Sequence, residues 1–254
     1  MILFYFILFT LLNAEEITGP CLNGYDQTQC HWVYNTVTKK LIISGTGDMP
    51  KYGAYVASDT TGRPFLKYKD EMETAEVSNG LTLISQYTFY SCSKLTSVTI
   101  GKDVKSIGQD AFTSSNSLQQ ITVNTENENY CDYQDGLYTK DKTQLIFYLS
   151  SSKRTELTLP KELTIIANKG LYDPYNLENI YVEEGNEDFK SIDGVLFKIK
   201  EDNSLELINY PPKNTREEYT TPNKVTSIAG YSFNDVFYIK RITISDSVKS
   251  ITTR

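Results

Sequence analysis

Apolar residues recur with a period of 23 along most of the chain. Units that begin at residues 77, 100, 159, 221 and 244 carry apolar side chains at their first, fifth and eighth positions, with Thr221 as the one polar exception. Later positions of the complete units are apolar as well: Phe89, Phe112, Leu171 and Phe233; Leu95, Leu118, Leu177 and Ile239; Val98, Ile121, Ile180 and Ile242. A single unit cannot bury these side chains alone, so the period predicts a stacked array of repeats.

Each unit closes with a stretch that is typical of a short strand. The segments LTSVTI, LQQITV, LENIYV and IKRITI alternate over their last four residues and are rich in β-branched side chains. This pattern predicts strands with one buried face. Because the rest of each unit must return the chain to the start of the next strand, we expect the strands to stack in parallel in a solenoid.

Two steps between units are longer than the period. The starts at 100, 159 and 221 are separated by 59 and 62 residues. Each long step contains an Asp-Gly pair followed by two apolar segments, DGLYTKDKTQLIFY and DGVLFKIKEDNSLELINYP. We therefore predict inserted β-hairpins near residues 124–156 and 183–218. The unit that begins at Ile244 stops at Arg254, before its closing strand, which predicts an incomplete last repeat.

The run LTSVTIGKDVKSIGQDAF resembles the leucine-rich repeat of the BspA type. Upstream, a C-x-W-x-Y pattern and the segment KKLIISGTGDM are similar to the N-terminal segment of that family. The resemblance covers roughly residues 20 to 251, and it implies a surface protein that binds extracellular matrix, host cells or other microbes. We expect a β-rich α/β leucine-rich-repeat solenoid over 77–254, preceded by a small β N-terminal cap at 15–76.

The N-terminus predicts secretion. Residues Ile2 to Leu12 form an uncharged apolar run, which is too short to cross a membrane as a helix. With the small residue Ala14 before a cleavage point, residues 1–14 are typical of a signal peptide, the alternative being a buried N-terminal strand. No second apolar run of 18 or more residues follows, so we expect a secreted or cell-surface protein with no transmembrane anchor in this chain.

Composition argues against two broad classes of function. The 254 residues include 32 acidic side chains against 25 Lys and Arg, a net charge of −7, which disfavours nucleic acid as a partner. A single histidine removes most acid–base and metal chemistry in advance. We therefore predict a protein that is not an enzyme and that uses no cofactor.

Four cysteines allow three pairings. Cys21 and Cys30 flank a short loop, and secretion permits a disulfide between them, although two unpaired thiols remain the alternative. Cys92 falls in a turn position of its unit, where a structural thiol is favoured over a nucleophile. Cys131 lies in an acidic loop without an evident partner.

Other candidate chemistry is weak. Asp59-Thr-Thr-Gly62 resembles half of an aspartic-protease signature, but no second copy exists. The acidic stretches at 126–135 and 183–188 offer hard oxygens to Ca²⁺, yet they lack an EF-hand pattern and solvated loops are favoured. We therefore predict no catalytic residues and no metal site.

The predicted strands offer a surface for binding instead. Side chains between the buried positions point to the open face of the sheet. Stacking would bring them into two columns: Ser97, Gln120, Asn179 and Arg241; Thr99, Thr122, Tyr181 and Thr243. We predict a non-catalytic adhesive protein that binds an extracellular protein or a host-cell surface ligand through these residues, although simple solvent-exposed strand residues would show the same pattern. The alternatives are a surface-coat component that self-associates through its open C-terminal end, and a secreted enzyme that uses the repeats as a scaffold.

Overall fold

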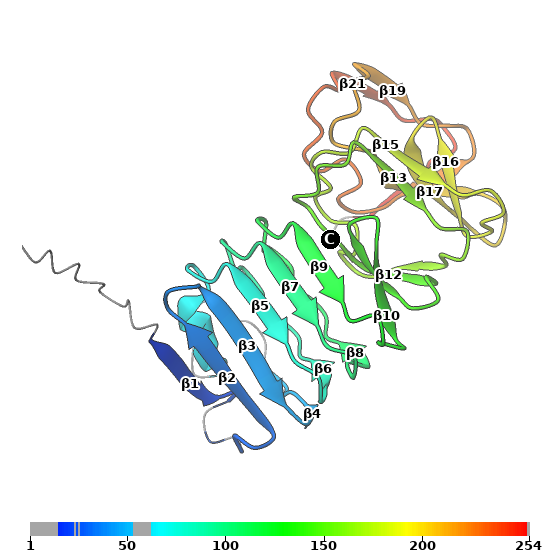
Figure 1. Cartoon of the computed structure of the whole chain (residues 1–254). Coiled ribbons are helices and arrows are strands. Elements are labelled where there is room, and N and C mark those ends of the chain that lie inside the picture. Colours follow the sequence, from blue (N-terminus) through cyan, green and yellow to red (C-terminus); the bar gives the residue numbers. More distant parts are fainter. Residues whose placement is uncertain (1–14, 23, 25, 53–61, 253–254) are drawn as a thin grey trace, which may run out of the picture.

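The computed structural model describes residues 15–22, 24, 26–52 and 62–252. The chain forms an elongated stack of coils that extends from the N-terminal strands to β19 (Glu218–Thr220) and β21 (Arg241–Thr243) at the far end (Figure 1). The predicted signal peptide and Asp59 lie outside the described residues. The predicted leucine-rich-repeat solenoid is confirmed. Its α/β component is wrong for the described part of the chain, where the one helical element is the short 3-10 helix η1 (Pro64–Tyr68).

A three-stranded antiparallel sheet forms the N-terminal end. Strands β1 (Glu16–Pro20), β2 (Cys30–Asn35) and β3 (Lys40–Gly45) pair in chain order. The ring of Tyr34 is fully buried and stacks on Tyr68 of η1 at 4.2 Å. Strand β3 then pairs in parallel with β5 (Thr74–Val77), so the sheet runs without a break through the boundary predicted at 76/77.

The parallel ladder follows the 23-residue register. Strands β5, β7 (Ser97–Ile100) and β9 (Gln120–Val123) lie side by side, with Val77 opposite Ile100 and Ile100 opposite Val123 (Figure 1). The same closing strands recur later as two pairs, β13 (Glu156–Leu159) with β15 (Asn179–Val182) and β19 (Glu218–Thr220) with β21 (Arg241–Thr243). We call the outward side of these seven strands the ladder face.

The coils without an inserted sheet contain a second strand that the sequence did not indicate. These strands are β4 (Gly47–Asp48), β6 (Leu81–Ile84), β8 (Ser106–Ile107), β14 (Ile165–Ile166), β20 (Val225–Ile228) and β22 (Ser250–Ile251).

The segment that leads from the second strand back to the ladder is a chain of tight turns. Its eleventh and fifteenth residues, counted from the start of the unit, have positive φ in four coils: Tyr87 and Ser91, Asp110 and Ser114, Lys169 and Asp173, Tyr231 and Asp235. Left-handed residues at two fixed positions prevent a continuous right-handed helix. This geometry is why the connection between strands is not helical.

Each long step holds a three-stranded antiparallel sheet. The first consists of β10 (Tyr130–Tyr133), β11 (Gly136–Thr139) and β12 (Gln144–Tyr148). The second consists of β16 (Phe189–Ile192), β17 (Val195–Ile199) and β18 (Leu205–Asn209). The Asp-Gly pairs stand at the turn between the first two strands of each sheet, so one strand precedes the two apolar segments seen in the sequence.

The third strand of each inserted sheet belongs to a complete coil. Strand β12 pairs in parallel with β14, and β18 pairs in parallel with β20. The hydrogen bond from Tyr148 N to Gly170 O repeats the bond from Phe89 N to Ala111 O in an ordinary coil, at the same 2.7 Å. Residues 136–158 and 198–220 are therefore 23-residue coils, and the extra segments are only 123–135 and 182–197.

Aromatic rings tie the coils together at the first inserted sheet. Phe89 and Phe112 stack at 5.7 Å, and Phe112 lies 5.8 Å from Phe147 of β12. Both Phe89 and Phe112 are buried. The core thus continues through the junction where the regular register is interrupted.

Cys21 and Cys30 form a disulfide at the N-terminal end of the stack. The bond closes a loop with a sequence separation of 9, for which chain entropy predicts about 2–3 kcal/mol of stabilisation. Replacing both cysteines with serine should lower the unfolding free energy by that amount. Trp32, the only tryptophan, lies in β2 and makes fluorescence-detected urea unfolding a direct measurement.

Cys131→Ser is the matched control for this experiment. Cys131 is a free and partly exposed thiol, so its replacement should change the unfolding free energy by less than about 0.5 kcal/mol. Equal stability of the oxidised wild type and the double serine variant would contradict a stabilising role for the disulfide.

Candidate ligand-binding face

The ladder face consists of alternate residues of the closing strands. In β7, Val98 and Ile100 are buried, whereas Ser97 is half-buried and Thr99 is exposed. Strand β9 repeats the pattern, with Gln120 and Thr122 exposed. Alternation along each strand therefore turns a polar row outward, as the sequence indicated.

The structure brings some of the predicted residues together. Ser97 lies opposite Gln120 and Thr99 lies opposite Thr122 in the β7–β9 pair. Beyond β9, the turn between β10 and β11 interrupts the ladder. Asp132 Oδ1 accepts a hydrogen bond from Val123 N at 2.9 Å, and Gln134 Oε1 accepts one from Thr158 N at 3.2 Å.

A second turn interrupts the face in the same way. Gly194 O accepts a hydrogen bond from Ile180 N at 2.8 Å, and Asp193 O accepts one from Arg216 Nη2 at 2.8 Å. The predicted four-residue columns are therefore split into three separate groups, because a hairpin turn stands at each junction. Asn179 is not the neighbour of Gln120, and Arg241 is not the neighbour of Asn179.

Six residues of the ladder face were missed by the sequence interpretation. They occupy the strands that precede the recognised units and lie directly opposite predicted residues: Thr74, Glu76, Glu156, Thr158, Glu218 and Thr220. Alternating apolar residues in ELTL at 156–159 carried the signal, since Leu157 and Leu159 are both fully buried.

A groove of about 580 Å³ crosses the carboxyl ends of β5, β7 and β9. Glu76, Thr99 and Thr122 line it, together with residues of the loops that follow these strands. Lys40 Nζ donates a hydrogen bond to Glu76 Oε2 at 2.8 Å. This bond is the largest of the effects that lower the pKa of the Glu76 carboxyl. The groove therefore carries an ionised carboxylate at neutral pH beside a lining of mixed polar and apolar residues.

The far part of the ladder face combines an aromatic ring with an ion pair. Tyr181 is 40% exposed and lies opposite Thr158. Arg241 Nη1 lies 3.1 Å from Glu218 Oε1, and both side chains are mostly exposed. Because exposed ion pairs are weak, about 0–1 kcal/mol, Arg241 can exchange this partner for a ligand at little cost.

Reactive groups are scarce in the described residues. No cluster of three His, Cys, Asp or Glu side chains suited to a metal ion occurs among them. Burial raises the pKa of the Cys92 thiol to about 12, so the thiol stays protonated. The ring of His31 lies on β2, where Nδ1 is 3.2 Å from Gln27 O.

The stacked coils and the outward polar face define a leucine-rich-repeat protein. Residues 62–134 and 212–254 match the model of the BspA type leucine rich repeat region, in six copies. These residues are therefore BspA-type leucine-rich repeats, and the resemblance drawn from the repeat register is confirmed. No helix in the described residues is both long and apolar enough to span a membrane.

Solved structures with similar folds come from bacteria. A leucine-rich repeat protein from Eubacterium ventriosum is 28% identical with a TM-score of 0.68, and the match covers 93% of this chain and 62% of that chain. A leucine rich cell surface protein from Faecalibacterium prausnitzii is 20% identical with a TM-score of 0.47, covering 89% of this chain and 72% of the other.

Pneumococcal vaccine antigen PcpA is 18% identical with a TM-score of 0.48, and the match covers 94% of this chain and 67% of that chain. The present chain thus spans less than two thirds of the Eubacterium protein. Comparison with proteins of curated function finds none that matches.

Proposed function

We propose that this chain is a secreted or cell-surface adhesive protein, without catalytic activity, that binds an extracellular protein ligand through the ladder face. The groove bordered by Glu76, Thr99 and Thr122 is the observation that carries the proposal. Solenoids commonly use their extended faces in this way. The BspA-type repeats at 62–134 and 212–254 support a function in protein binding.

Substitutions in the groove test this function. Thr99→Lys with Thr122→Lys places two long cations in the groove without touching the core, because both threonines are exposed. We expect saturable binding of the wild-type chain to immobilised matrix proteins or epithelial cells. The dissociation constant of the variant should be at least tenfold larger, that is, its binding should be weaker. Surface plasmon resonance measures both.

Ser106→Lys serves as the matched control, because Ser106 is an exposed residue of a second strand, away from the ladder face. Its binding should equal that of the wild type. Tyr181→Ala and Arg241→Ala extend the test to the far part of the face. Binding that is unchanged by all the face substitutions would overturn the choice of this surface.

Self-association is the alternative with a specific observation behind it. The apolar side chains of Ile242, Ile244 and Ile251 are 37%, 41% and 61% exposed. Sedimentation velocity of the same protein distinguishes the two functions, because a coat component forms concentration-dependent oligomers and a monomeric adhesin does not.

A further inference from the structure

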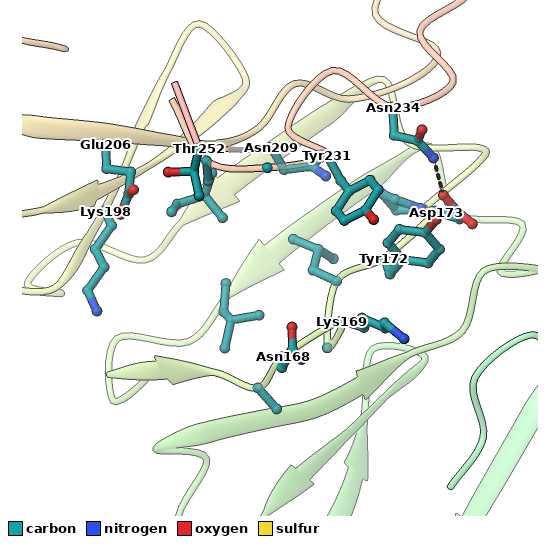
Figure 2. Close-up of a pocket in the computed structure, with 18 of the residues that line it drawn as sticks. Asn168, Lys169, Tyr172, Asp173, Lys198, Glu206, Asn209, Tyr231, Asn234 and Thr252 are labelled. Carbon is teal, nitrogen blue, oxygen red and sulfur yellow. Dashed lines mark hydrogen bonds between the residues drawn. The ribbon is translucent and has the colours of Figure 1, made fainter. Parts of the chain in front are cut away.

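A pocket of about 380 Å³ lies on the second-strand side of the solenoid (Figure 2). The turn around Tyr172 and Asp173 and the turn around Tyr231 and Asn234 form two of its walls, and strand β18 forms another. The pocket occurs where one parallel sheet stops. Strand β14 pairs with β12 only, and the following coil contributes β18 to a different sheet.

The pocket lies at the second inserted sheet, and the first inserted sheet shows how the equivalent space can be filled. The segments LIFY at 145–148 and LINY at 207–210 occupy the same place in their coils, since Tyr148 N and Tyr210 N donate equivalent 2.7 Å hydrogen bonds to the next coil. Phe147 and Asn209 are thus structural equivalents. At the first junction the Phe147 ring lies 5.8 Å from that of Phe112, whereas the smaller amide of Asn209 leaves the second junction open.

Asn209 is not explained by the fold. Its side chain is 7% exposed, and its Oδ1 is buried without a hydrogen-bond partner in the described part of the chain. Leaving a buried polar atom unsatisfied costs about 1–3 kcal/mol. Asn209 lines the pocket, but its Oδ1 has almost no accessible surface, so a ligand hydroxyl would pair with this atom only after the amide rotates. An amide in the pocket lining, at a position where the sister coil has phenylalanine, favours a polar ligand over an apolar one.

Aromatic rings form one wall of the pocket. Tyr172 and Tyr231 come from different coils, and their rings meet edge to face at 5.3 Å and 88°. Tyr231 is 49% exposed. The negative ring faces of tyrosine attract the weakly positive C–H groups of a saturated ring.

Hydrogen-bond donors and acceptors lie beside the two tyrosine rings. The carboxylate of Asp173 accepts hydrogen bonds from Asn234 Nδ2 at 2.5 Å, drawn in Figure 2, and from the Tyr175 hydroxyl at 3.0 Å. Carboxylates keep further lone pairs, and amides both donate and accept. The formal charges of the lining residues cancel, with Lys169 and Lys198 against Asp173 and Glu206. Lys169 Nζ also lies 3.1 Å from Asp110 Oδ1, behind the lining.

We propose that this pocket binds a short neutral saccharide. A sugar ring presents C–H groups to tyrosine and several hydroxyls to the amides and the carboxylate, and its lack of charge suits the balanced lining. The volume lies within the range of about 300–1,000 Å³ that is usual for ligand pockets. The site is separate from the ladder face, so the chain would hold one ligand on each side of the coil.

The test uses the full chain and a panel of neutral sugars: glucose, galactose, mannose, N-acetylglucosamine and their disaccharides. Saturation-transfer-difference NMR detects binding, and titration gives dissociation constants. We expect at least one sugar to bind. Asn209→Phe, which copies the sister junction, should weaken that binding at least tenfold while leaving thermal stability equal or higher.

Tyr231→Asn is a second variant, because asparagine tolerates the positive φ of 62° at this position. It should also weaken sugar binding at least tenfold. The groove variant Thr99→Lys with Thr122→Lys should leave it unchanged, and Asn209→Phe should leave protein binding at the ladder face unchanged. The proposal is overturned if no panel sugar binds, if sugar binding survives both pocket variants, or if the pocket variants abolish binding of a peptide library instead.

Discussion

Replacing Phe112 with alanine should lower the free energy of unfolding by about 3–5 kcal/mol. The Phe112 ring is 2% exposed and lies between two others, stacked on Phe89 at 5.7 Å and 5.8 Å from Phe147. Its removal opens a cavity at the junction between an ordinary coil and the first inserted sheet. Because each coil of a solenoid contacts only its neighbours, no other contact replaces the lost one.

Urea unfolding followed by circular dichroism measures this loss. Phe237→Ala is the matched control, because Phe237 is 61% exposed and its replacement should cost less than about 0.5 kcal/mol. A loss below 1 kcal/mol for Phe112→Ala would show that the junction is not held by this ring. Hydrogen exchange should also show faster opening of β7 to β12 in the variant.

Asn127→Ala should be the most damaging polar substitution, with a loss of about 3–4 kcal/mol from four hydrogen bonds. Asn127 is 1% exposed. Its Nδ2 donates to Gly101 O at 2.9 Å and to Val104 O at 3.1 Å, and its Oδ1 accepts from the backbone N of Asn129 and Tyr130, each at 2.8 Å. Alanine leaves all four backbone groups without this partner.

Asn124→Ala is the control for this experiment, because the Asn124 side chain accepts a single exposed hydrogen bond, from Glu126 N at 2.9 Å. We expect a change below about 1 kcal/mol. Asn186 makes the same four contacts at the second junction, with Pro160, Leu163, Asp188 and Phe189. Asn186→Ala should therefore reproduce the Asn127 result, and a small effect at either position would contradict the shared role.

The repeat register predicted the buried positions of the inner coils well. Val98, Ile100 and Phe112 are all buried where the period placed them. In the last coil the same register is wrong about burial, because Ile242, Ile244 and Ile251 are exposed. The second strands were not predictable, because some have only two residues, such as Ser106–Ile107, and form through pairing with the neighbouring coil. Local pattern carries no information about such pairing.

The coils at 136–158 and 198–220 escaped detection because their first halves follow the hairpin pattern rather than the repeat pattern. A signal was present nonetheless. Asn127 and Asn186 stand at the fifth position of units counted from Val123 and Val182, where every recognised unit has an apolar residue. A polar residue twice at that position marks where the chain leaves the regular register.

The candidate site was predictable in composition and not in arrangement. Alternation identified Thr99 and Thr122 as outward residues, and their pairing follows from the 23-residue step. The separation of Asn179 from Gln120 depends on the β10–β11 turn. Nor did the sequence single out Asn209. Its equivalence to Phe147 becomes visible only from the matching hydrogen bonds of the two coils.

The two short extra segments have a consequence for how the chain finds its native pairing. In an array of identical 23-residue units, a strand can dock one unit too early or too late with nearly the same energy, and repeat proteins misassemble in this way. Residues 123–135 and 182–197 make the neighbouring coils unlike one another. In a displaced coil, the Asn127 or Asn186 carboxamide would lose its hydrogen bonds to the carbonyls of the preceding coil. We therefore expect these two asparagines to disfavour incorrect coil pairing during folding.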